Sequence, residues 1–215
     1  LGKYVNSPET PIFAKSKILY GLHKSKSRIK DAGSVLLVEG QMDFLMTYQS
    51  GIENVVASSG TALTGEQLKL LRRLTDNLVL SFDSDEAGQN AAERSIDLAL
   101  VNDFAVKILL LPEKDPAELL RHQPELLKKL LAEAGPAKDF YFSRYLHGGD
   151  DDYLRKRGVR LILAKVRNLF SSLDQLSWLR ELSRRSGIEE KFLVAEMLNL
   201  PAAVLRDRVT TTPAA

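Results

Sequence analysis

Acidic side chains follow three apolar runs of this sequence, and their type and placement suit a site for divalent cations. Each group comes after β-forming residues: Glu39 and Asp43 after 35–38, Asp83 and Asp85 after 78–82, and Asp115 after 106–112. In an open parallel sheet, ligand sites gather at the carboxyl ends of the strands. Hard cations such as Mg²⁺ prefer oxygen ligands there and keep several waters for substrate phosphates. The pattern therefore predicts a metal site for phosphoryl or nucleotidyl transfer.

The same acids also have a local structural interpretation. Asp83 and Asp85 can cap the helix that follows them, and Asp115 before Pro116 has the form of an N-cap with proline at the first helical position. For Asp115, capping and metal binding stay open as equal alternatives. A functional role is favoured for Glu39, because a carboxylate that ends an aliphatic strand is costly to bury without a cation or hydrogen bonds.

The composition is that of a globular protein of one or two domains, with 215 residues, 44% hydrophobic and 27% charged. No apolar run approaches the ~20 residues that span a bilayer, and the N-terminus lacks a signal-peptide pattern. We therefore expect a cytoplasmic protein without membrane partners. The absence of cysteine excludes disulfides, thiolate zinc sites and cysteine nucleophiles. His23, His122 and His147 are too far apart in sequence to form a metal-ligand pair by spacing.

The net charge of +2 conceals three segments of alternating sign. Residues 1–34 carry +5, residues 35–150 carry −7 and residues 151–215 carry +4. An acidic middle repels a polyanion unless cations neutralise it, whereas basic flanks attract phosphate backbones. We expect an acidic catalytic centre between basic guides. The alternative is that these basic residues only keep the protein soluble.

Strands alternate with helices up to residue 111, which predicts a parallel sheet with right-handed crossovers. The expected strands are 35–38, 54–57, 78–82 and 104–111, and the expected helices are 12–27, 41–49, one opened by Thr64, and 86–101. Thr64 and Gln67 fit a capping box at the start of the third of these helices.

After Pro116 the apolar residues take helical spacing to the end, and we expect no further strand. The expected helices are 124–134, 136–146, 153–170, 175–185 and 189–198. At helical spacing an aromatic residue such as Trp178 or Tyr153 more often packs in the core than stacks on a base. The fold class is therefore an α/β parallel-sheet core followed by an α-helical bundle. Its expected ranges are a basic segment 1–34, a sheet domain 35–123, a helical subdomain 124–209 and a frayed tail 210–215.

Three motifs and the opening of the sequence resemble the TOPRIM-containing RNA polymerase region of bacterial DnaG-type primases. They are Val38-Glu39-Gly40-Gln41-Met42-Asp43, Ser59-Gly60-Thr61-Ala62-Leu63-Thr64, Phe82-Asp83-Ser84-Asp85-Glu86-Ala87-Gly88 and the opening Lys3-Tyr4-Val5-Asn6-Ser7-Pro8-Glu9-Thr10. Topoisomerases, recombination proteins and some nucleases share the acidic motifs, but the opening points to primases. The resemblance implies that 35–123 is a TOPRIM metal-binding domain and that 1–34 comes from the preceding polymerase subdomain.

The resemblance implies a primase, a DNA-directed RNA polymerase that makes short RNA primers for DNA replication by metal-dependent nucleotidyl transfer. It assigns residues to three roles: metal binding by Glu39, Asp43, Asp83, Asp85 and Asp115; catalysis by Glu39, Asp83 and Asp85; and nucleotide or nucleic-acid binding by Lys3, Tyr4, Asn6, Lys15, Gly40, Gly60 and Thr61. The implied cofactors are two or more Mg²⁺ or Mn²⁺ ions, without zinc in this fragment. The implied partners are single-stranded DNA, ribonucleoside triphosphates and, through a module outside this sequence, the replicative helicase. The implied location is the bacterial cytoplasm, in association with the nucleoid.

The sequence departs from the family pattern at Ala117, where the family usually has a second aspartate two positions after the one that matches Asp115. This departure is expected to weaken one metal site. We interpret the sequence as a fragment of the polymerase region that need not initiate primers alone. Two alternatives remain open. A TOPRIM nuclease or topoisomerase-like enzyme would use the same acids to cut DNA, although no tyrosine here has a recognisable transesterifying setting, and a non-catalytic module would only bind nucleic acid.

Overall fold

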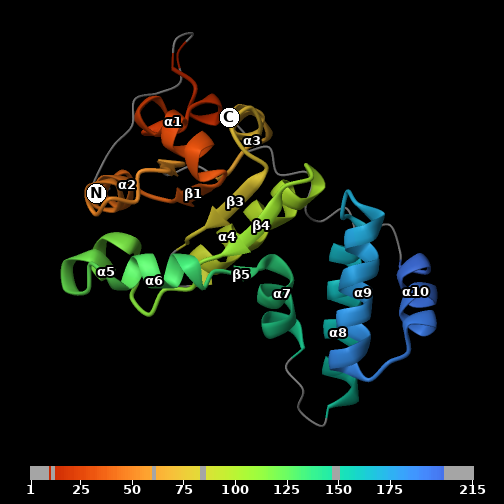
Figure 1. The fold of residues 1–215 in the computed structure, drawn as a ribbon. Helices are drawn as coiled ribbons and strands as arrows, with labels where there is room; N and C mark the ends of the chain where they lie inside the picture. The colour runs from red at the N-terminus through yellow and green to blue at the C-terminus, as the bar shows by residue number, and fades with distance from the viewer. Residues whose placement is uncertain (1–9, 11–12, 60–61, 83–85, 147–150, 201–215) are drawn as a thin grey trace. The chain divides into compact units, whose positions relative to one another are not determined.

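The computed structural model describes residue 10 and residues 13–59, 62–82, 86–146 and 151–200. The strands within these ranges are β1 (Val35–Val38), β2 (Val55–Ala57), β3 (Asn77–Leu80), β4 (Ala105–Ile108) and β5 (Gly135–Pro136). The helices are the 3₁₀ turn η1 (Lys15–Lys17) and the α-helices α1 (Leu22–Ala32), α2 (Gln41–Gln49), α3 (Gly65–Arg72), α4 (Glu86–Val101), α5 (Pro116–His122), α6 (Leu126–Ala132), α7 (Ala137–Tyr145), α8 (Asp152–Arg167), α9 (Ser172–Ser186) and α10 (Glu190–Leu198). Figure 1 shows their arrangement. No described helix has both the length and the apolar character that a membrane crossing needs.

The chain divides into two compact units whose limits differ from the ranges expected from sequence. The sheet unit comprises Leu1–Ser95 and Leu109–Ala134, and the helical unit comprises Ile96–Ile108 and Gly135–Ala215. The first unit contains the parallel strands, and the second contains β4, β5 and the last four helices.

Parallel pairing of β1 with both β2 and β3 confirms the expected parallel arrangement. Leu37 of β1 is in register with Val56 on one side and with Leu80 on the other. Every residue of β1 is at most 1% exposed. A continuous apolar run of this kind is typical of a strand buried on both faces. Leu109 donates its backbone N–H to the Leu80 carbonyl at 2.9 Å, so the chain after β4 runs beside β3.

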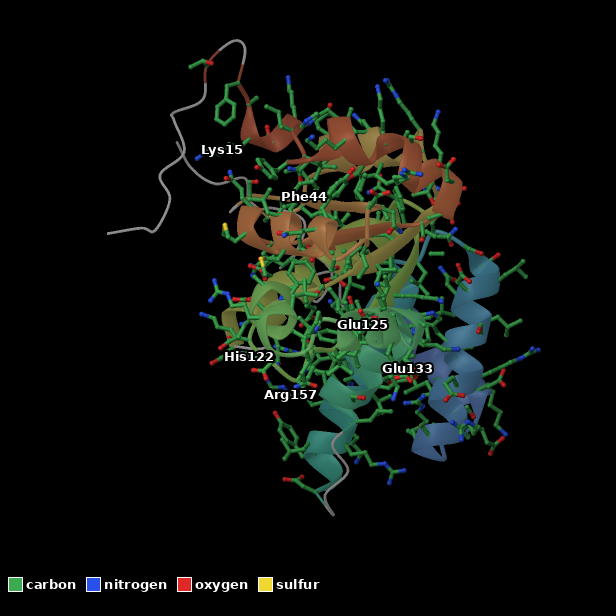
Figure 2. All side chains as sticks on the ribbon, turned by 60° about the vertical axis from the view of Figure 1, so that its left-hand side comes forward. Lys15, Phe44, His122, Glu125, Glu133 and Arg157 are labelled. Carbon is green, nitrogen blue, oxygen red and sulfur yellow. The ribbon has the colours of Figure 1, made fainter. Side chains whose placement is uncertain are left out.

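An apolar core joins β1 and β2 to α2, α5 and α6 in the sheet unit. Its buried members include Leu36, Val55, Phe44, Leu119 and Leu127. Phe44, labelled in Figure 2, is 3% exposed. Burial of a side chain of this size contributes about 1.5–3 kcal/mol relative to its exposure to water. The core therefore holds α2 and α5, which begin next to predicted acids, against the sheet.

The helical unit packs α8, α9 and α10 side by side (Figure 1). Trp178 of α9 is 7% exposed, and its ring lies 5.8 Å from that of Tyr141 and 6.1 Å from that of Phe142 between centroids. This confirms its expected core position. Tyr153 is 71% exposed, so the expectation that it packs in the core is wrong. It stands in the first turn of α8, where a helix end leaves it facing water.

An ion pair between a buried lysine and a partly exposed aspartate also holds the helical unit together. The Lys165 ammonium of α8 bonds the Asp97 carboxylate of α4, and the Tyr141 hydroxyl of α7 donates to the same carboxylate at 2.7 Å. Lys165 also lies 4.8 Å from the centre of the Tyr141 ring. The pair therefore gains both a hydrogen bond and a cation–π contact, which offset the cost of desolvating the two charges.

The helix expected over 12–27 is wrong in its bounds, because long-range pairing holds the preceding chain extended. Tyr20 exchanges two backbone hydrogen bonds with Ala57 of β2, at 2.8 and 3.1 Å. Gly21 follows with a φ of +81°, and α1 begins only after it. The helix then continues to Ala32, five residues beyond the expected end at 27, where Gly33 closes it with a φ of +62°.

Further expectations after residue 104 need correction. The strand expected over 104–111 ends at Ile108, and the helix that Asp115 was predicted to cap as one of two alternatives is α5, from Pro116 to His122. The expectation of no strand beyond Pro116 is also wrong. Gly135 and Pro136 form β5, which pairs antiparallel with β4. A two-residue strand has no periodicity of its own, so only its partner defines it.

We predict that Gly21→Ala destabilises the fold far more than Gly33→Ala. Both glycines have positive φ, which costs a non-glycine residue about 1–2 kcal/mol. A Cβ at position 21 would also overlap the Phe44 ring, whereas a Cβ at position 33 meets nothing within 4 Å. Overpacking adds about 1–3 kcal/mol, so the expected losses are roughly 2–5 and 1–2 kcal/mol. Urea unfolding of both variants measures them, and equal losses would contradict the steric argument.

We predict a pH dependence of stability from Glu181 on α9. Hydrogen bonds from Arg184 and then Arg185 lower the pKa of Glu181 from 4.5 to about 2. Because the folded pKa lies below the unfolded one, the stabilisation is fully present above about pH 4.5 and is lost as the pH falls toward 2. The difference in unfolding free energy between the parent and Glu181→Gln should therefore shrink from pH 5 to pH 2. A difference that stays constant over this range would show that the ion pairs contribute nothing.

Candidate metal and nucleotide site

The loops after β1 and β2 meet at the carboxyl edge of the sheet. Val38 and Ala57 are in register, and the ladder continues one step further: Ser58 donates its N–H to Val38 at 3.1 Å, and Ser59 donates to the Glu39 carbonyl at 2.9 Å. Glu39 is therefore held by its backbone at this edge, and it is partly buried there. This is the position that the sequence predicted for a functional carboxylate.

Asp43 lies in the first turn of α2 and is only 7% exposed. Its Oδ2 accepts the backbone N–H of Gly40 at 3.0 Å, and its Oδ1 accepts the backbone N–H of Ala117 at 3.2 Å. Both donors belong to helix amino ends, where the helix dipole also favours a negative charge. These interactions compensate the burial of the carboxylate, so the fold itself requires Asp43.

Gly40 serves the same arrangement. Its φ of −100° and ψ of 157° are open to any residue, so backbone conformation does not require glycine there. A Cβ on Gly40 would instead lie 2.7 Å from Oδ2 of Asp43. The absence of a side chain therefore allows the carboxylate to approach the backbone of the loop after β1. Close approach of metal and phosphates to Gly40 remains a prediction.

Asp115 caps α5, as one of its two predicted roles requires. Its Oδ1 accepts the N–H of Glu118 at 2.7 Å, and Pro116 occupies the first turn. A carboxylate that accepts one N–H keeps other lone pairs, so the cap leaves its metal role untested. Ala117 in the same turn is 6% exposed and gives its N–H to Asp43. The two acids thus meet at one helix start, Asp115 as its cap and Asp43 as a partner from α2.

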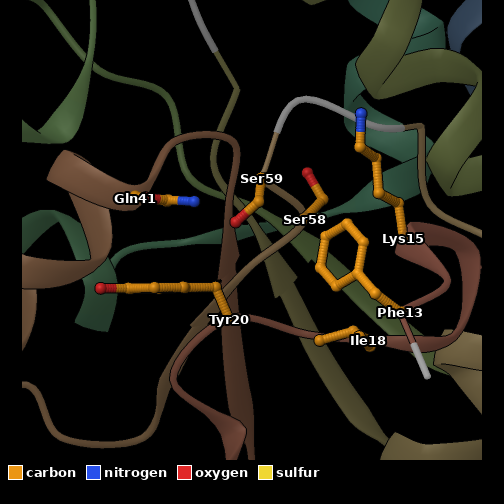
Figure 3. A pocket seen from close by; sticks show the side chains of 7 residues that line it. All are labelled: Phe13, Lys15, Ile18, Tyr20, Gln41, Ser58 and Ser59. Atoms are coloured by element: carbon orange, nitrogen blue, oxygen red, sulfur yellow. The ribbon is translucent and has the colours of Figure 1, made fainter. Parts of the chain in front are cut away.

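A small cavity of about 70 Å³ opens beside the same edge of the sheet (Figure 3). Lys15 lines it with residues from the loops after β1 and β2 and from the entry to α1: Phe13, Ile18, Tyr20, Gln41, Ser58 and Ser59. The space is too small for a whole nucleotide but adjoins the loop that carries Glu39. The structure therefore places Lys15, a predicted phosphate ligand, at the edge where the acids were expected.

Thr64 and Gln67 hold η1, and with it Lys15, in place. The predicted capping box is confirmed, with Gln67 donating its N–H to Thr64 Oγ1 at 3.2 Å and Thr64 donating its N–H to Gln67 Oε1 at 3.0 Å. The same side chains also reach the preceding segment. Gln67 Nε2 donates to the carbonyls of Lys15 and Ile18 at 3.2 and 2.8 Å, and the Thr64 hydroxyl donates to the Ser16 carbonyl at 2.5 Å. The sequence predicted the cap, but no sequence pattern indicated that the same two side chains would also bind the backbone around Lys15.

The remaining predicted site residues lie outside the described part of the chain: Lys3, Tyr4, Asn6, Gly60, Thr61, Asp83 and Asp85. Among the described residues, no group of three or more acidic or histidine side chains is close enough to hold a metal ion. The described part brings together Glu39, Asp43 and Lys15 around the edge of the sheet unit. Its acids offer oxygen atoms only, a donor set that suits Mg²⁺ or Mn²⁺.

We predict that Asp43→Asn destabilises the protein by about 2–3 kcal/mol, because the amide retains only one acceptor oxygen for two backbone N–H groups. Asp115→Asn is the matched control. It is expected to cost less than about 0.5 kcal/mol, since Asp115 is seen to use one oxygen and asparagine caps as well as aspartate. Denaturant unfolding at neutral pH compares the two. Similar losses of stability would show that the two hydrogen bonds of Asp43 contribute no more than the single cap made by Asp115.

Comparisons with known proteins agree with this architecture. Residues 36–120 match the Toprim-like family, and residues 1–26 match the N-terminal domain of the DNA primase catalytic core. The DNA primase of Clostridium acetobutylicum is 35% identical over 198 residues, covering 88% of this chain and 32% of the relative. The chain thus spans about a third of the length of this curated relative.

Solved structures give the same result. A DNA primase domain from Pseudomonas aeruginosa superposes with a TM-score of 0.81 at 30% identity, over 93% of this chain and 64% of that one. A DnaG primase catalytic domain bound to single-stranded DNA superposes with a TM-score of 0.77 at 31% identity, over 88% and 62%. The chain therefore belongs to the bacterial DnaG-type DNA primases and corresponds to the Toprim-containing part of their catalytic core.

Proposed function

We propose that this chain forms the metal-binding part of a catalytic core that synthesises short RNA primers on single-stranded DNA. The observation that carries the proposal is its similarity, over 93% of its length, to a DNA primase domain. The partly buried Glu39 at the carboxyl edge of the parallel strands supports a catalytic centre at this edge. The cytoplasm is the compartment that we propose for this activity.

The reaction joins two nucleotides. The 3′-hydroxyl oxygen of one attacks the α-phosphorus of the next, a new phosphodiester bond forms, and pyrophosphate leaves. Glu39, Asp83 and Asp85 are the proposed metal ligands, with Asp43 and Asp115 as further candidates. Bound Mg²⁺ or Mn²⁺ would neutralise the triphosphate and the pyrophosphate leaving group. Glu39 also receives a proton or orients a water beside the attacking oxygen.

Lys15 is proposed to bind phosphate groups of the template or of the incoming nucleotide. Its place in the cavity beside Ser58 and Ser59 supports this role, because that cavity adjoins the loop of Glu39. Lys3, Tyr4 and Asn6 are proposed to act with it. Gly60 and Thr61, which follow Ser59 in the sequence, are proposed to let backbone N–H groups approach the same phosphates.

Three partners follow from this proposal. The DnaG domain that superposes on this chain is bound to single-stranded DNA, which supports such a template here. Ribonucleoside triphosphates are the proposed substrates. The replicative helicase is proposed to bind through a part of the enzyme outside these 215 residues.

We predict that the chain binds Mn²⁺ saturably and that a ribonucleoside triphosphate strengthens this binding. Asp83→Asn should weaken Mn²⁺ binding by about tenfold or more, because it removes a negative ligand. Asp31→Asn on the exposed side of α1 is a matched control that removes the same charge away from the proposed site. Paramagnetic relaxation of water protons during a Mn²⁺ titration measures all three proteins.

Two outcomes would contradict the proposal. Equal weakening by Asp83→Asn and Asp31→Asn would show an effect of net charge alone. Absence of specific Mn²⁺ binding in the parent would mean that Glu39 and the other predicted acids have structural roles only. The chain would then be a non-catalytic module that binds nucleic acid.

A further inference from the structure

Helix α1 is the most basic exposed element of the sheet unit. Its eleven residues include four basic side chains and one acidic side chain. The buried residues Ser25 and Ile29 mark the side that packs on the unit, and the charged residues of the helix are exposed. This distribution leaves a strongly positive surface toward water.

The free charges of this helix lie on its outer face. Arg28 pairs with Glu53 at 2.7 Å, so its charge is balanced. Within the part of the chain that the structure describes, no carboxylate pairs with Lys24, Lys26 or Lys30. Lys26 and Lys30 are four residues apart and therefore share one face of the helix. Three unbalanced positive charges on one short helix repel each other, a cost that a polyanion would relieve.

The helix leads away from the candidate site. It begins just after Tyr20, which pairs with Ala57 at the carboxyl end of β2 and lines the cavity with Lys15. It ends at Ala32, just before β1 starts at Val35. Eleven residues make about 16 Å of helix, so α1 runs back along the sheet from the carboxyl edge to the opposite edge. Its lysines extend the positive charge of Lys15 along that course.

We infer that the exposed surface of α1, with Lys26 and Lys30 on one face and Lys24 on the other side of that surface, binds the phosphate backbone of the single-stranded template outside the catalytic site. This inference rests on the proposed function, which supplies the nucleic acid. Contacts of this kind are independent of sequence and weaken with salt. A membrane surface is the less suitable partner, because α1 exposes no apolar face: Ile29 is buried and Leu22, in the first turn, is only partly exposed.

We predict that Lys26→Glu with Lys30→Glu weakens binding of a fluorescein-labelled thymidylate single strand by roughly tenfold or more at about 0.1 M salt. Loss of two phosphate contacts should also make the dependence of log K on log salt shallower by about 1.4, at about 0.7 per contact on a single strand. Neutral substitutions, Lys26→Gln with Lys30→Gln, should give a smaller loss in the same direction. Fluorescence anisotropy during salt titrations of the 215-residue chain measures both quantities.

Lys128→Glu with Lys129→Glu on α6 is the matched control. These lysines are also exposed, with Lys128 lying 3.8 Å from Glu125, and their replacement changes the net charge by the same amount. Helix α6 lies across the sheet from α1 (Figures 1 and 2). The control should leave DNA binding nearly unchanged. Mn²⁺ binding should be the same in the parent and in both double variants, because α1 lies outside the proposed metal ligands.

Several results would overturn the inference. Equal weakening by the α1 and α6 variants would assign the effect to net charge, and loss of Mn²⁺ binding in the α1 variant would assign it to the catalytic site. Binding of anionic phospholipid vesicles in place of DNA would identify a membrane surface. If the parent binds no single strand even at low salt, the template part of the proposed function fails as well, whereas failure confined to the α1 variant leaves that function intact.

Discussion

The carboxylate of Asp43 joins the first turn of α2 to the first turn of α5, and the arrangement of the candidate site depends on this link. Its two oxygens accept backbone N–H groups from Gly40 and Ala117, and the side chain is 7% exposed. An uncompensated buried carboxylate would cost several kcal/mol, so these two donors are a condition for the fold. Because Glu39 lies just before Gly40, the N-cap of α2, and Asp115 is the N-cap of α5, one interaction constrains the backbone that carries both of these acids.

The parallel strands provide the second constraint. Backbone hydrogen bonds continue one residue past the strands, from Ser58 to Val38 and from Ser81 to Leu37, at 3.1 and 2.9 Å. The loops at the carboxyl edge therefore begin from fixed positions. The cavity beside Lys15 is bounded by the loops after β1 and β2, and Gln67 holds its other side through the carbonyl of Lys15. Rigid backbone on both sides is what a site for phosphate groups requires, since each contact must be held within a fraction of an ångström.

Local patterns predicted most elements of the fold. The bounds of β1, α2 and α4 agree with expectation, because an apolar run and helical spacing are properties of adjacent residues. The start of α1 could not be predicted, since Tyr20 is held extended by pairing with Ala57, far along the chain. The same limit applies to the site. The sequence identified Asp43 as an acid of interest, but its partner Ala117 lies 74 residues away and bonds through the backbone, which no side-chain pattern records.

The departure at Ala117 has a physical consequence for the proposed metal centre. Its side chain is 6% exposed, and its N–H already binds Asp43. An aspartate at this position would add a second carboxylate on a buried helix turn beside Asp43, and two like charges so placed raise the cost of ionising both. Alanine avoids that repulsion, and Asp43 keeps its structural role as the acceptor of two backbone N–H groups. Asp43 and Asp115 thus already accept N–H bonds at helix starts, and any part that they take in the proposed metal binding uses their remaining lone pairs.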